Sequence, residues 1–344
     1  MSLLPVSRIP EPLDAPTLRW GVLAPGWIAH QMVSALQRSS QKVVAVGSRS
    51  AERAREFADA YGIERAYGSY EALVSDPGVD VVYVASPHSE HRAQALLAIA
   101  AGKHVLVEKA FTRNAAEARE VVAAARAAKV VCMEAMWPRY APRYDIVRQL
   151  LADGALGDIV SVHADHSQLI PESRAPRLHD PDLAGGAMLD LGVYPVSFVS
   201  FVLGAPSVVK AVGTLTHRGV DSTVSAVATG FADHPQAVAT ITTTLAAASG
   251  VSAMIAGTEG RIELDGRFYA PGPVRLVRPD GSSVTAPQVG AESTDALMYQ
   301  ASHLATLAAE GATESPLLPL DEVVSVMATM DDLRFQVGNR LPGE

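Results

Sequence analysis

The residues with the clearest chemical capacity are Glu108 and Lys109, which directly follow the apolar run His104–Val107. This run predicts a short buried strand, and Gly102 and Lys103 end the helical pattern before it. A lysine at the carboxyl end of such a strand can give or take a proton if a nearby cationic ring lowers its pKa. The alternative is an ordinary exposed Glu–Lys pair in a loop. Taken alone, this segment leaves the two interpretations even.

A second group that could handle protons is formed by Asp190 and Tyr194, in the segment 185–195. This segment leads into an apolar run that predicts a helix to about residue 203. Residues four apart in a helix share one face, so the carboxylate and the phenol would lie together. Pro195 removes a backbone donor and is expected to disturb the helix at this point. The alternative is a packed helix tyrosine whose hydroxyl is bonded to backbone.

The elements that must position these groups begin with a predicted strand at 18–23 and a helix to about residue 38. Between them, the segment 24–29 reads Ala-Pro-Gly-Trp-Ile-Ala. It resembles the Gly-x-Gly-x-x-Gly/Ala turn of dinucleotide-binding sheets, with Ala24 in place of the first glycine. Such a turn places a pyrophosphate on a helix N-terminus. An ordinary strand–turn–helix is an equal alternative. The candidate cofactor contacts here are Gly26, Trp27 and Ile28.

The end of the second predicted strand, 42–47, indicates which nucleotide such a turn would hold. NAD sites usually place an acidic residue there to bind the ribose 2′-hydroxyl, whereas this chain has Ser48, Arg49 and Ser50. Arg53 follows one turn into the next predicted helix. An arginine can pair with a 2′-phosphate through a charge-assisted fork, or lie flat on adenine. We therefore favour NADP, with NAD as a possible substitute, over a merely exposed arginine at a helix start.

A further strand at 79–85 ends in the polar segment 86–91, before a helix predicted from about residue 90. Ser86, His88 and His91 would then lie at the same sheet edge as Glu108 and Lys109. We include all three as candidate cofactor contacts because of this position.

From residue 18, predicted strands and helices alternate along the chain up to an aromatic stretch at 136–142 that is interrupted by prolines. This stretch contains Trp137 and Arg139. This alternation predicts an α/β fold with a doubly wound parallel sheet. Beyond it, successive Thr- and Val-rich strands to about residue 276 predict an open-faced, largely antiparallel sheet in a C-terminal α+β domain. The predicted division is an N-terminal arm at 1–17, a Rossmann domain at 18–137 and a substrate-binding and oligomerisation domain at 138–344.

Composition narrows the partners. The net charge is −9 and there is no basic block, which argues against nucleic acid and against anionic membranes. Cys132 is the only cysteine, so we expect no internal disulfide and no cysteine-based metal site. We also expect no apolar run of about 18 residues and no leader segment, and hence a cytoplasmic protein. No metal site is expected.

Taken together, these segments resemble the Gfo/Idh/MocA oxidoreductases along nearly the whole chain, from residue 18 to residue 338. The resemblance is carried by 24–29, 86–91, 101–109, 133–139 and 185–195, which occur in the family's order and spacing. Within the family, the chain is most similar to the dimeric dihydrodiol dehydrogenase and NADP-dependent xylose dehydrogenase branch. That branch has tyrosine where many relatives have histidine, and here the position is Tyr194.

The resemblance implies an NAD(P)-dependent dehydrogenase or reductase acting on CH–OH groups of a sugar or a cyclic trans-diol. It implies Lys109 and Tyr194 as catalytic residues, with Tyr194 the direct acid/base and Asp190 assisting. Ala110 replaces the proline of the family's Glu-Lys-Pro motif, which leaves the lysine's chemistry in place. Glu108, Trp137 and Arg139 are carried over as cofactor or pocket contacts, and a homodimer or higher homo-oligomer is expected.

Two other functions remain open at this point. One is an enzyme of the same fold that retains its cofactor for a non-redox or net-neutral reaction, such as an elimination. The other is a cofactor-binding regulatory protein without turnover. The presence of both a lysine and a tyrosine able to handle protons disfavours the regulatory protein, because a binding protein has no need for two such groups.

Overall fold

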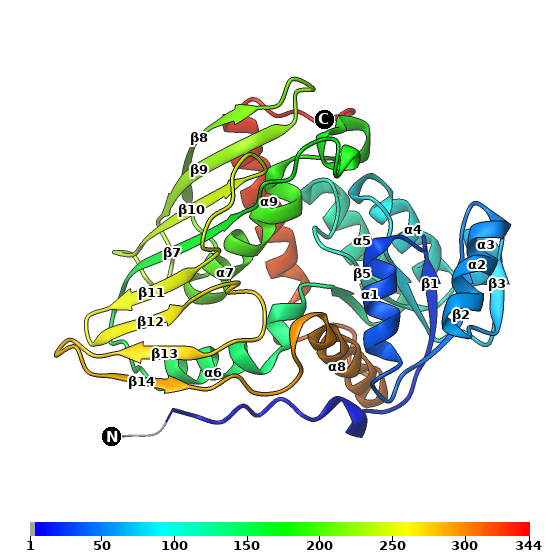
Figure 1. The fold of residues 1–344 in the computed structure, drawn as a ribbon, viewed down its shortest axis with the longest axis horizontal. Helices are drawn as coiled ribbons and strands as arrows, with labels where there is room; N and C mark the ends of the chain where they lie inside the picture. Colours follow the sequence, from blue (N-terminus) through cyan, green and yellow to red (C-terminus); the bar gives the residue numbers. More distant parts are fainter. Residues whose placement is uncertain (1–3) are drawn as a thin grey trace. The chain divides into compact units, whose positions relative to one another are not determined.

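The computed structural model describes residues 4–344, which divide into two compact units (Figure 1). The first unit consists of Pro10–Tyr140 and Ala291–Val323. The second consists of Ala141–Gly290 and Val324–Glu344, together with the described residues before Pro10. Each unit is built around its own sheet, so each is described by itself.

The first unit contains a six-stranded sheet in the order β3-β2-β1-β4-β5-β6, and every pairing in it is parallel. The order reverses between β1 and β4, and in such sheets ligands bind outside the carboxyl ends of the strands at that switch point. The strands are β1 (Arg19–Leu23), β2 (Lys42–Gly47), β3 (Arg65–Tyr67), β4 (Val81–Val84), β5 (His104–Val107) and β6 (Cys132–Glu134).

Helices cover this parallel sheet, and side-chain caps fix where several of them begin. Ser50 and Asn114 each accept a backbone N–H from the first turn of the helix that follows, as an N-cap should. The helices are α1 (Trp27–Leu36), α2 (Ala51–Tyr61), α3 (Tyr70–Val74), α4 (His88–Ala100), α5 (Ala115–Ala128) and α8 (Leu297–Glu310), with 3₁₀ turns η1 (Pro12–Asp14), η2 (Trp137–Tyr140) and η6 (Ser293–Ala296).

The central strands are buried on both faces, as a doubly covered sheet requires. All four residues of β4 and the last three of β5 are buried. The apolar runs at 79–85 and 104–107 therefore form the core strands that the sequence predicts. Their carboxyl ends carry the polar segments singled out above.

The contact-defined first unit differs from the predicted Rossmann range because it includes residues 291–323. The reason is that α8 packs on α1, β5, η1 and η2, and the Ser302 hydroxyl donates to the Pro12 carbonyl. The backbone N–H of Cys132 also donates to the carbonyl of Thr313. This segment and the proline-rich arm thus complete the core of the first unit, although they lie at opposite ends of the chain.

The second unit is built on an eight-stranded sheet in the order β14-β13-β12-β11-β7-β10-β9-β8. Only the pairing of β7 with β10 is parallel, so the sheet is largely antiparallel and the predicted fold class is confirmed. The strands are β7 (Ile159–Ser167), β8 (Val208–Leu215), β9 (Asp221–Thr229), β10 (Val238–Thr244), β11 (Ala253–Gly257), β12 (Gly260–Leu264), β13 (Val274–Val277) and β14 (Ser283–Ala286).

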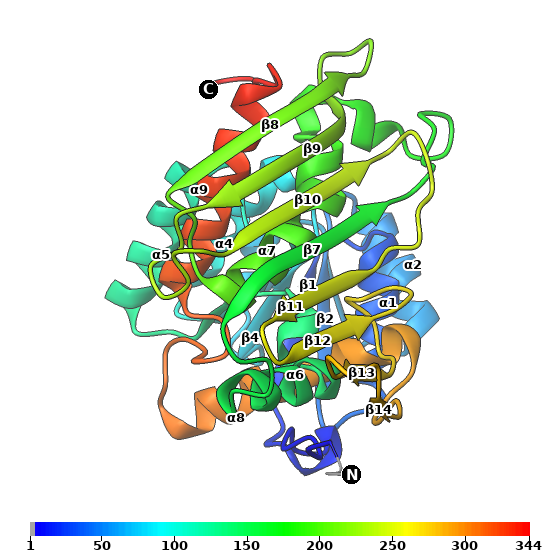
Figure 2. The same cartoon turned by 90° about the vertical axis from the view of Figure 1, so that its left-hand side faces the viewer.

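One face of this sheet is covered by helices. They are α6 (Pro142–Ala152), α7 (Val193–Leu203) and the part of α9 (Leu320–Gln336) that lies beyond Val323. The 3₁₀ turns η3 (Pro176–His179) and η4 (Pro181–Leu183) and a π-helical turn, η5 (Met188–Gly192), precede α7. Figure 2 shows β8, β9, β10 and β7 side by side with α7 and α9 behind them, and no described helix in front. Side chains on that open face include Val212, which is 74% exposed, and Val227 and Val238.

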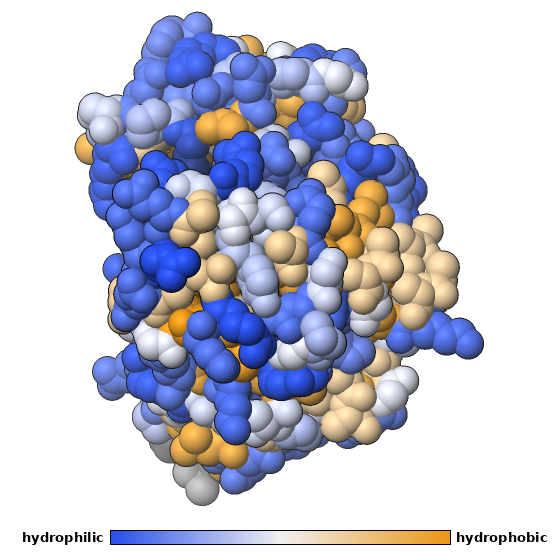
Figure 3. Space-filling view, turned by 90° about the vertical axis from the view of Figure 1, so that its right-hand side faces the viewer, coloured by the Kyte–Doolittle hydropathy of each residue, from blue (hydrophilic) through white to orange (hydrophobic). Residues whose placement is uncertain are grey.

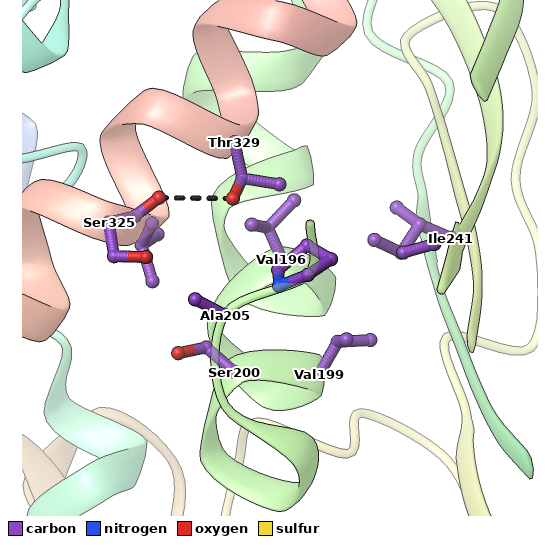
Figure 4. Close-up of a pocket in the computed structure, with 10 residues that line it drawn as sticks. Val196, Val199, Ser200, Ala205, Ile241, Ser325 and Thr329 are labelled. Carbon is purple, nitrogen blue, oxygen red and sulfur yellow. Dashed lines mark hydrogen bonds between the residues drawn. The ribbon is translucent and has the colours of Figure 1, made fainter. Parts of the chain in front are cut away.

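A small cavity of about 10 Å³ lies on the covered face, between α7, α9 and the strands β9 and β10 (Figure 4). Val196 and Val199 approach it from α7 and Ile241 from β10, while the Thr329 hydroxyl donates to the Ser325 carbonyl on α9. A volume of this size holds at most one water molecule. The core of the second unit is therefore closely packed, and this cavity is no ligand site.

The segment Pro181–Leu203 is long and apolar enough to cross a membrane by length and composition alone. This differs from the expectation that no apolar run of that length occurs. However, 94% of its most apolar window is buried inside the structure, as expected for a core helix.

Candidate active site

The turn after β1 has the backbone of a nucleotide-binding loop. Ala24, in place of the first glycine, has a left-handed backbone with φ of +61°, a conformation that glycine adopts without steric cost. Gly26 caps α1 with extended backbone and no side-chain cap bond. A Cβ at Gly26 would meet only the Ala24 carbonyl, at 3.9 Å, so this side of the turn is open. Trp27, 73% exposed, and half-buried Ile28 are the first residues of α1.

The end of β2 presents hydroxyl and guanidinium groups. Ser48 is buried, and its hydroxyl accepts the N–H of Ser50, whose own hydroxyl accepts the N–H of Arg53. The side chains of Arg49 and Arg53 are exposed at the start of α2. Arg49 also acts on Tyr70 at the start of α3, where burial raises the pKa of the phenol and the guanidinium lowers it. This edge can therefore offer two cations and hydroxyl groups to an anion.

The segment after β4 differs in detail from its prediction, because α4 begins at His88 and takes in both histidines. The buried hydroxyl of Ser86 has no hydrogen-bond partner among the described residues. His88 is buried in the first turn and lies edge-on to His91.

His91 differs from its predicted role as a cofactor contact, because its side chain is fully buried. Its two ring nitrogens lie 2.8 and 2.9 Å from the carbonyl oxygens of Ser86 and Ala110, and burial lowers the pKa of the imidazole. His91 thus ties the end of β4 to the segment that follows Lys109, which is a structural role.

Glu108 and Lys109 lie at the carboxyl end of β5, as predicted. Glu108 is buried, and it accepts the Tyr83 hydroxyl at 2.5 Å and the backbone N–H of Lys109 at 3.2 Å. Lys109 is half-buried, and the peptide bond from it to Ala110 is cis. These contacts anchor the backbone of the lysine rather than its side chain.

Trp137 and Arg139 lie in the 3₁₀ turn after β6, and both are buried. The Arg139 guanidinium donates to the carbonyl of Leu317 and pairs with Glu322 at 2.8 Å. Arg139 therefore holds the 291–323 segment in the first unit, which differs from its predicted contact with a cofactor or substrate. The pairing satisfies a buried charge that would otherwise be costly.

In the second unit, Asp190 and Tyr194 are not on one regular α-helix. Asp190 lies in the π-helical turn η5 and Tyr194 is the second residue of α7, so Pro195 falls in the first turn, where proline is tolerated. Asp190 is buried and pairs with Arg177 at 3.2 Å.

The phenol ring of Tyr194 belongs to an aromatic cluster. Tyr269 stacks on it with ring centroids 4.5 Å apart, and buried His166 contacts it edge-on at 5.1 Å. Arg143, which is buried on α6, donates to four backbone carbonyls of the 265–273 loop that carries Tyr269. Burial lowers the pKa of this guanidinium to about 10. Tyr194 thus has aromatic neighbours, and the loop that carries one of them is fixed by the buried Arg143 guanidinium.

The start of the π-turn is anchored by buried Asp221, which accepts the backbone N–H of Met188 at 2.6 Å and the side-chain amide of Asn339 at 2.5 Å. A Cβ at Gly186, whose φ is +117°, would lie 2.4 Å from the Asp221 carboxylate. This explains why the chain has glycine here.

Sequence reasoning missed several of these groups. His166 could have been found, because it lies at an inward position of an alternating strand. Glu134, at the carboxyl end of β6, could also have been found from its place beside Glu108. Nothing in the sequence marks the contacts of Tyr269, Arg143 or Asp221, because they join segments far apart in the chain.

Two properties of the surroundings complete the description. Among residues 4–344, no group of three or more His, Cys, Asp or Glu side chains could hold a metal ion. The face shown in Figure 3 is mostly hydrophilic, with apolar residues in small groups.

A parallel sheet with this strand order, an open glycine turn after β1 and a basic edge after β2 defines a dinucleotide-binding protein, and the second unit adds an open-faced sheet. The comparisons agree. Residues 18–136 match the model described as "Oxidoreductase family, NAD-binding Rossmann fold", and residues 144–263 match "GFO/IDH/MocA C-terminal domain". The chain belongs to the GFO/IDH/MocA oxidoreductase family, and the predicted enzyme class, an NAD(P)-dependent dehydrogenase or reductase, is confirmed.

Several curated relatives share one name. Trans-1,2-dihydrobenzene-1,2-diol dehydrogenase of Mus musculus is 36% identical over 335 residues, covering 94% of this chain and 98% of the relative. The Homo sapiens protein has the same identity and coverage.

Solved structures share the fold. The 3-ketoreductase KijD10 from Actinomadura kijaniata, with NADP and TDP-benzene, is 27% identical with a TM-score of 0.80, over 93% of this chain and 98% of its own. Levoglucosan dehydrogenase with NADH and levoglucosan has a TM-score of 0.84 at 21% identity, over 93% and 96% of the two chains.

Proposed function

We propose that this protein transfers a hydride between NADP and a hydroxyl carbon of a sugar or a cyclic trans-diol. The observation that carries the cofactor part is the end of β2, where Ser48, Arg49 and Arg53 stand in place of an acidic residue. The diol part rests on likeness to the dihydrodiol dehydrogenases, and the sugar part on the levoglucosan complex among the fold neighbours.

The residues of the first unit fit a dinucleotide. Gly26 leaves the turn open where a pyrophosphate would bind, the exposed Arg49 and Arg53 would hold a 2′-phosphate, and the Ser86 hydroxyl would be a hydrogen-bond partner at the end of β4. Bound there, the nicotinamide would supply the hydride chemistry, and the protein would supply binding, orientation and proton handling.

For the proton, we propose Tyr194 as the direct acid/base and Lys109 as the group that holds the substrate oxygen and tunes the phenol. A tyrosine has an ordinary pKa of about 10, so it needs a neighbouring cation to act as a base at neutral pH. The aromatic cluster around Tyr194 supports this role, because it leaves the ring little freedom to turn away. Asp190, paired with Arg177, would accept a hydrogen bond from a neighbouring substrate hydroxyl.

We also propose a homodimer formed through the open face of the second sheet. Val212, Val227 and Val238 are exposed there among threonines, and exposed apolar sheet faces are usually covered. The occupant we favour is the same face of a second copy. Light scattering at micromolar concentration should give twice the chain mass, and a monomer would contradict this part of the proposal.

The test of the reaction is a screen with NADP and a panel of sugars, inositols and dihydrodiols, followed by the absorbance of the reduced nicotinamide. On the best substrate, Tyr194→Phe and Lys109→Met should each lower kcat by about 10²–10⁴, while nucleotide binding changes by only a few-fold. Tyr144→Phe, a buried tyrosine of the same unit, is the matched control and should keep its turnover.

The outcomes separate the candidate functions. Product without net change in absorbance indicates a non-redox enzyme of this fold, and nucleotide binding without any product indicates a regulatory protein. If Tyr194→Phe keeps near-normal turnover, Tyr194 is not the acid/base.

A further inference from the structure

Glu134 is a buried carboxyl on the strand beside the one that leads to Lys109, and the proposed reaction leaves it without a role. It ends β6, which pairs with β5, and register places it opposite Val107, directly before the Glu108–Lys109 pair. Its side chain is 2% exposed. Burial of an ionisable carboxyl is costly, so its retention at the edge of the sheet calls for a function.

The contacts of Glu134 point to that function. One carboxyl oxygen accepts the backbone N–H of Phe111 at 3.0 Å, two residues beyond Lys109. From the other side, the His91 ring contacts the Ala110 carbonyl. The peptide group that joins Ala110 to Phe111 is therefore held from two different elements, at its carbonyl by His91 and at its N–H by Glu134.

The charge of Glu134 matters less than its geometry. Burial, together with the neighbouring Glu108, raises the pKa of this carboxyl to about 8, so at neutral pH it is mostly protonated. A neutral acid adds no second negative charge beside Lys109, and its carbonyl oxygen still accepts a hydrogen bond. An amide in the same place would do the same.

We propose that Glu134 is a positioning residue for Lys109, acting through its hydrogen bond to the Phe111 N–H. This inference rests on the proposed role of Lys109 in the reaction. It predicts that acceptor geometry, and not the ability to ionise, is what the position requires.

Two variants separate these properties. Glu134→Gln keeps the length and an acceptor oxygen but cannot ionise, whereas Glu134→Asp keeps the carboxyl but withdraws it by one methylene, too far for the 3.0 Å contact. We expect kcat within about threefold of the wild type for the glutamine variant and about 10- to 100-fold lower for the aspartate variant. The affinity for NADP should change little in either.

A second readout does not depend on activity. Hydrogen exchange of the peptide containing Phe111, measured on the whole chain without substrate, should speed up in Glu134→Asp and stay unchanged in Glu134→Gln. Glu117→Asp is the matched control, because Glu117 is also buried and accepts the N–H of Arg113 on the same loop. It should leave kcat unchanged.

The proposal is overturned if Glu134→Asp keeps normal turnover. It is likewise overturned if Glu134→Gln loses turnover, which would show that the position must ionise. It is also overturned if exchange at Phe111 is equal in the two variants. Failure of the role proposed for Lys109 is a separate result. In that case Lys109→Met keeps its turnover, whatever the Glu134 variants do.

Discussion

Replacing Arg49 by alanine is the most direct test of cofactor choice. Arg49 is exposed at the end of β2, where it can reach a 2′-phosphate through solvent-facing contacts. A phosphate carries a charge of about −1.5 to −2 at neutral pH. A unit charge pair about 4 Å apart in water contributes about 1 kcal/mol, so the pair is worth about 2 kcal/mol. That corresponds to a loss of about thirtyfold in NADP affinity.

The assay is titration of each nucleotide against the intrinsic tryptophan fluorescence, since Trp27 opens α1 beside the glycine turn. Arg49→Ala should weaken NADP about thirtyfold by the same arithmetic and NAD by less than about threefold. Raising the salt concentration should shrink the wild-type preference, because exposed charge pairs are screened.

The matched control is Arg55→Ala. Arg55 is an exposed arginine of α2 that lies two residues beyond Arg53, so the two side chains extend from different faces of the helix. It should leave both affinities unchanged. Equal affinity of the unmutated protein for NADP and NAD, or an equal loss of both in Arg49→Ala, would refute the assignment of the 2′-phosphate to this edge.

Two predictions concern stability. Burial raises the pKa of Glu134 in the folded state to about 8, above its ordinary value of 4.5. Between these two values the folded state keeps a proton that the unfolded state has lost. The free energy of unfolding therefore falls as the pH rises from 4.5 to about 8. Glu134→Gln should therefore gain in melting temperature over the wild type between pH 5 and pH 8, and a constant difference would contradict the buried acid. Asp221→Ala should lower the free energy of unfolding, measured in urea, by about 2–4 kcal/mol. The reason is that the substitution leaves the buried Met188 N–H and the Asn339 amide without an acceptor. A loss below about 1 kcal/mol would show that these groups find other partners.

Most of the first sheet could be predicted from the sequence, because its signals are local. The strands at 42–47 and 104–107 have the predicted bounds, since each is a short apolar run closed by polar residues. The helix at 115–128 is equally clear, with Asn114 as its cap. Local patterns of this kind need no knowledge of the partner segments.

Contacts between distant segments could not be predicted. The motif around Arg139 predicts a contact with the cofactor or the substrate pocket. In the structure its guanidinium pairs with Glu322, 183 residues further along the chain. The π-helical turn that holds Asp190 could not be predicted either. It has one more residue than a regular helical turn, which changes the face on which a side chain lies without changing the composition of the segment. The backbone of the site is therefore visible in the sequence, while its supporting side chains are not.

These supporting side chains share one arrangement. In the first unit, His91 and Glu134 bond to backbone groups of the two residues after Lys109. In the second, Asp221 bonds to the backbone at the start of the turn that leads to Tyr194. In each case a buried polar group bonds to the main chain near the proposed catalytic residue. Such bonds fix the backbone from which the proton-handling side chain extends, as a preorganised site requires. Substitutions of these buried groups should therefore affect the position of the catalytic side chains more than their chemistry.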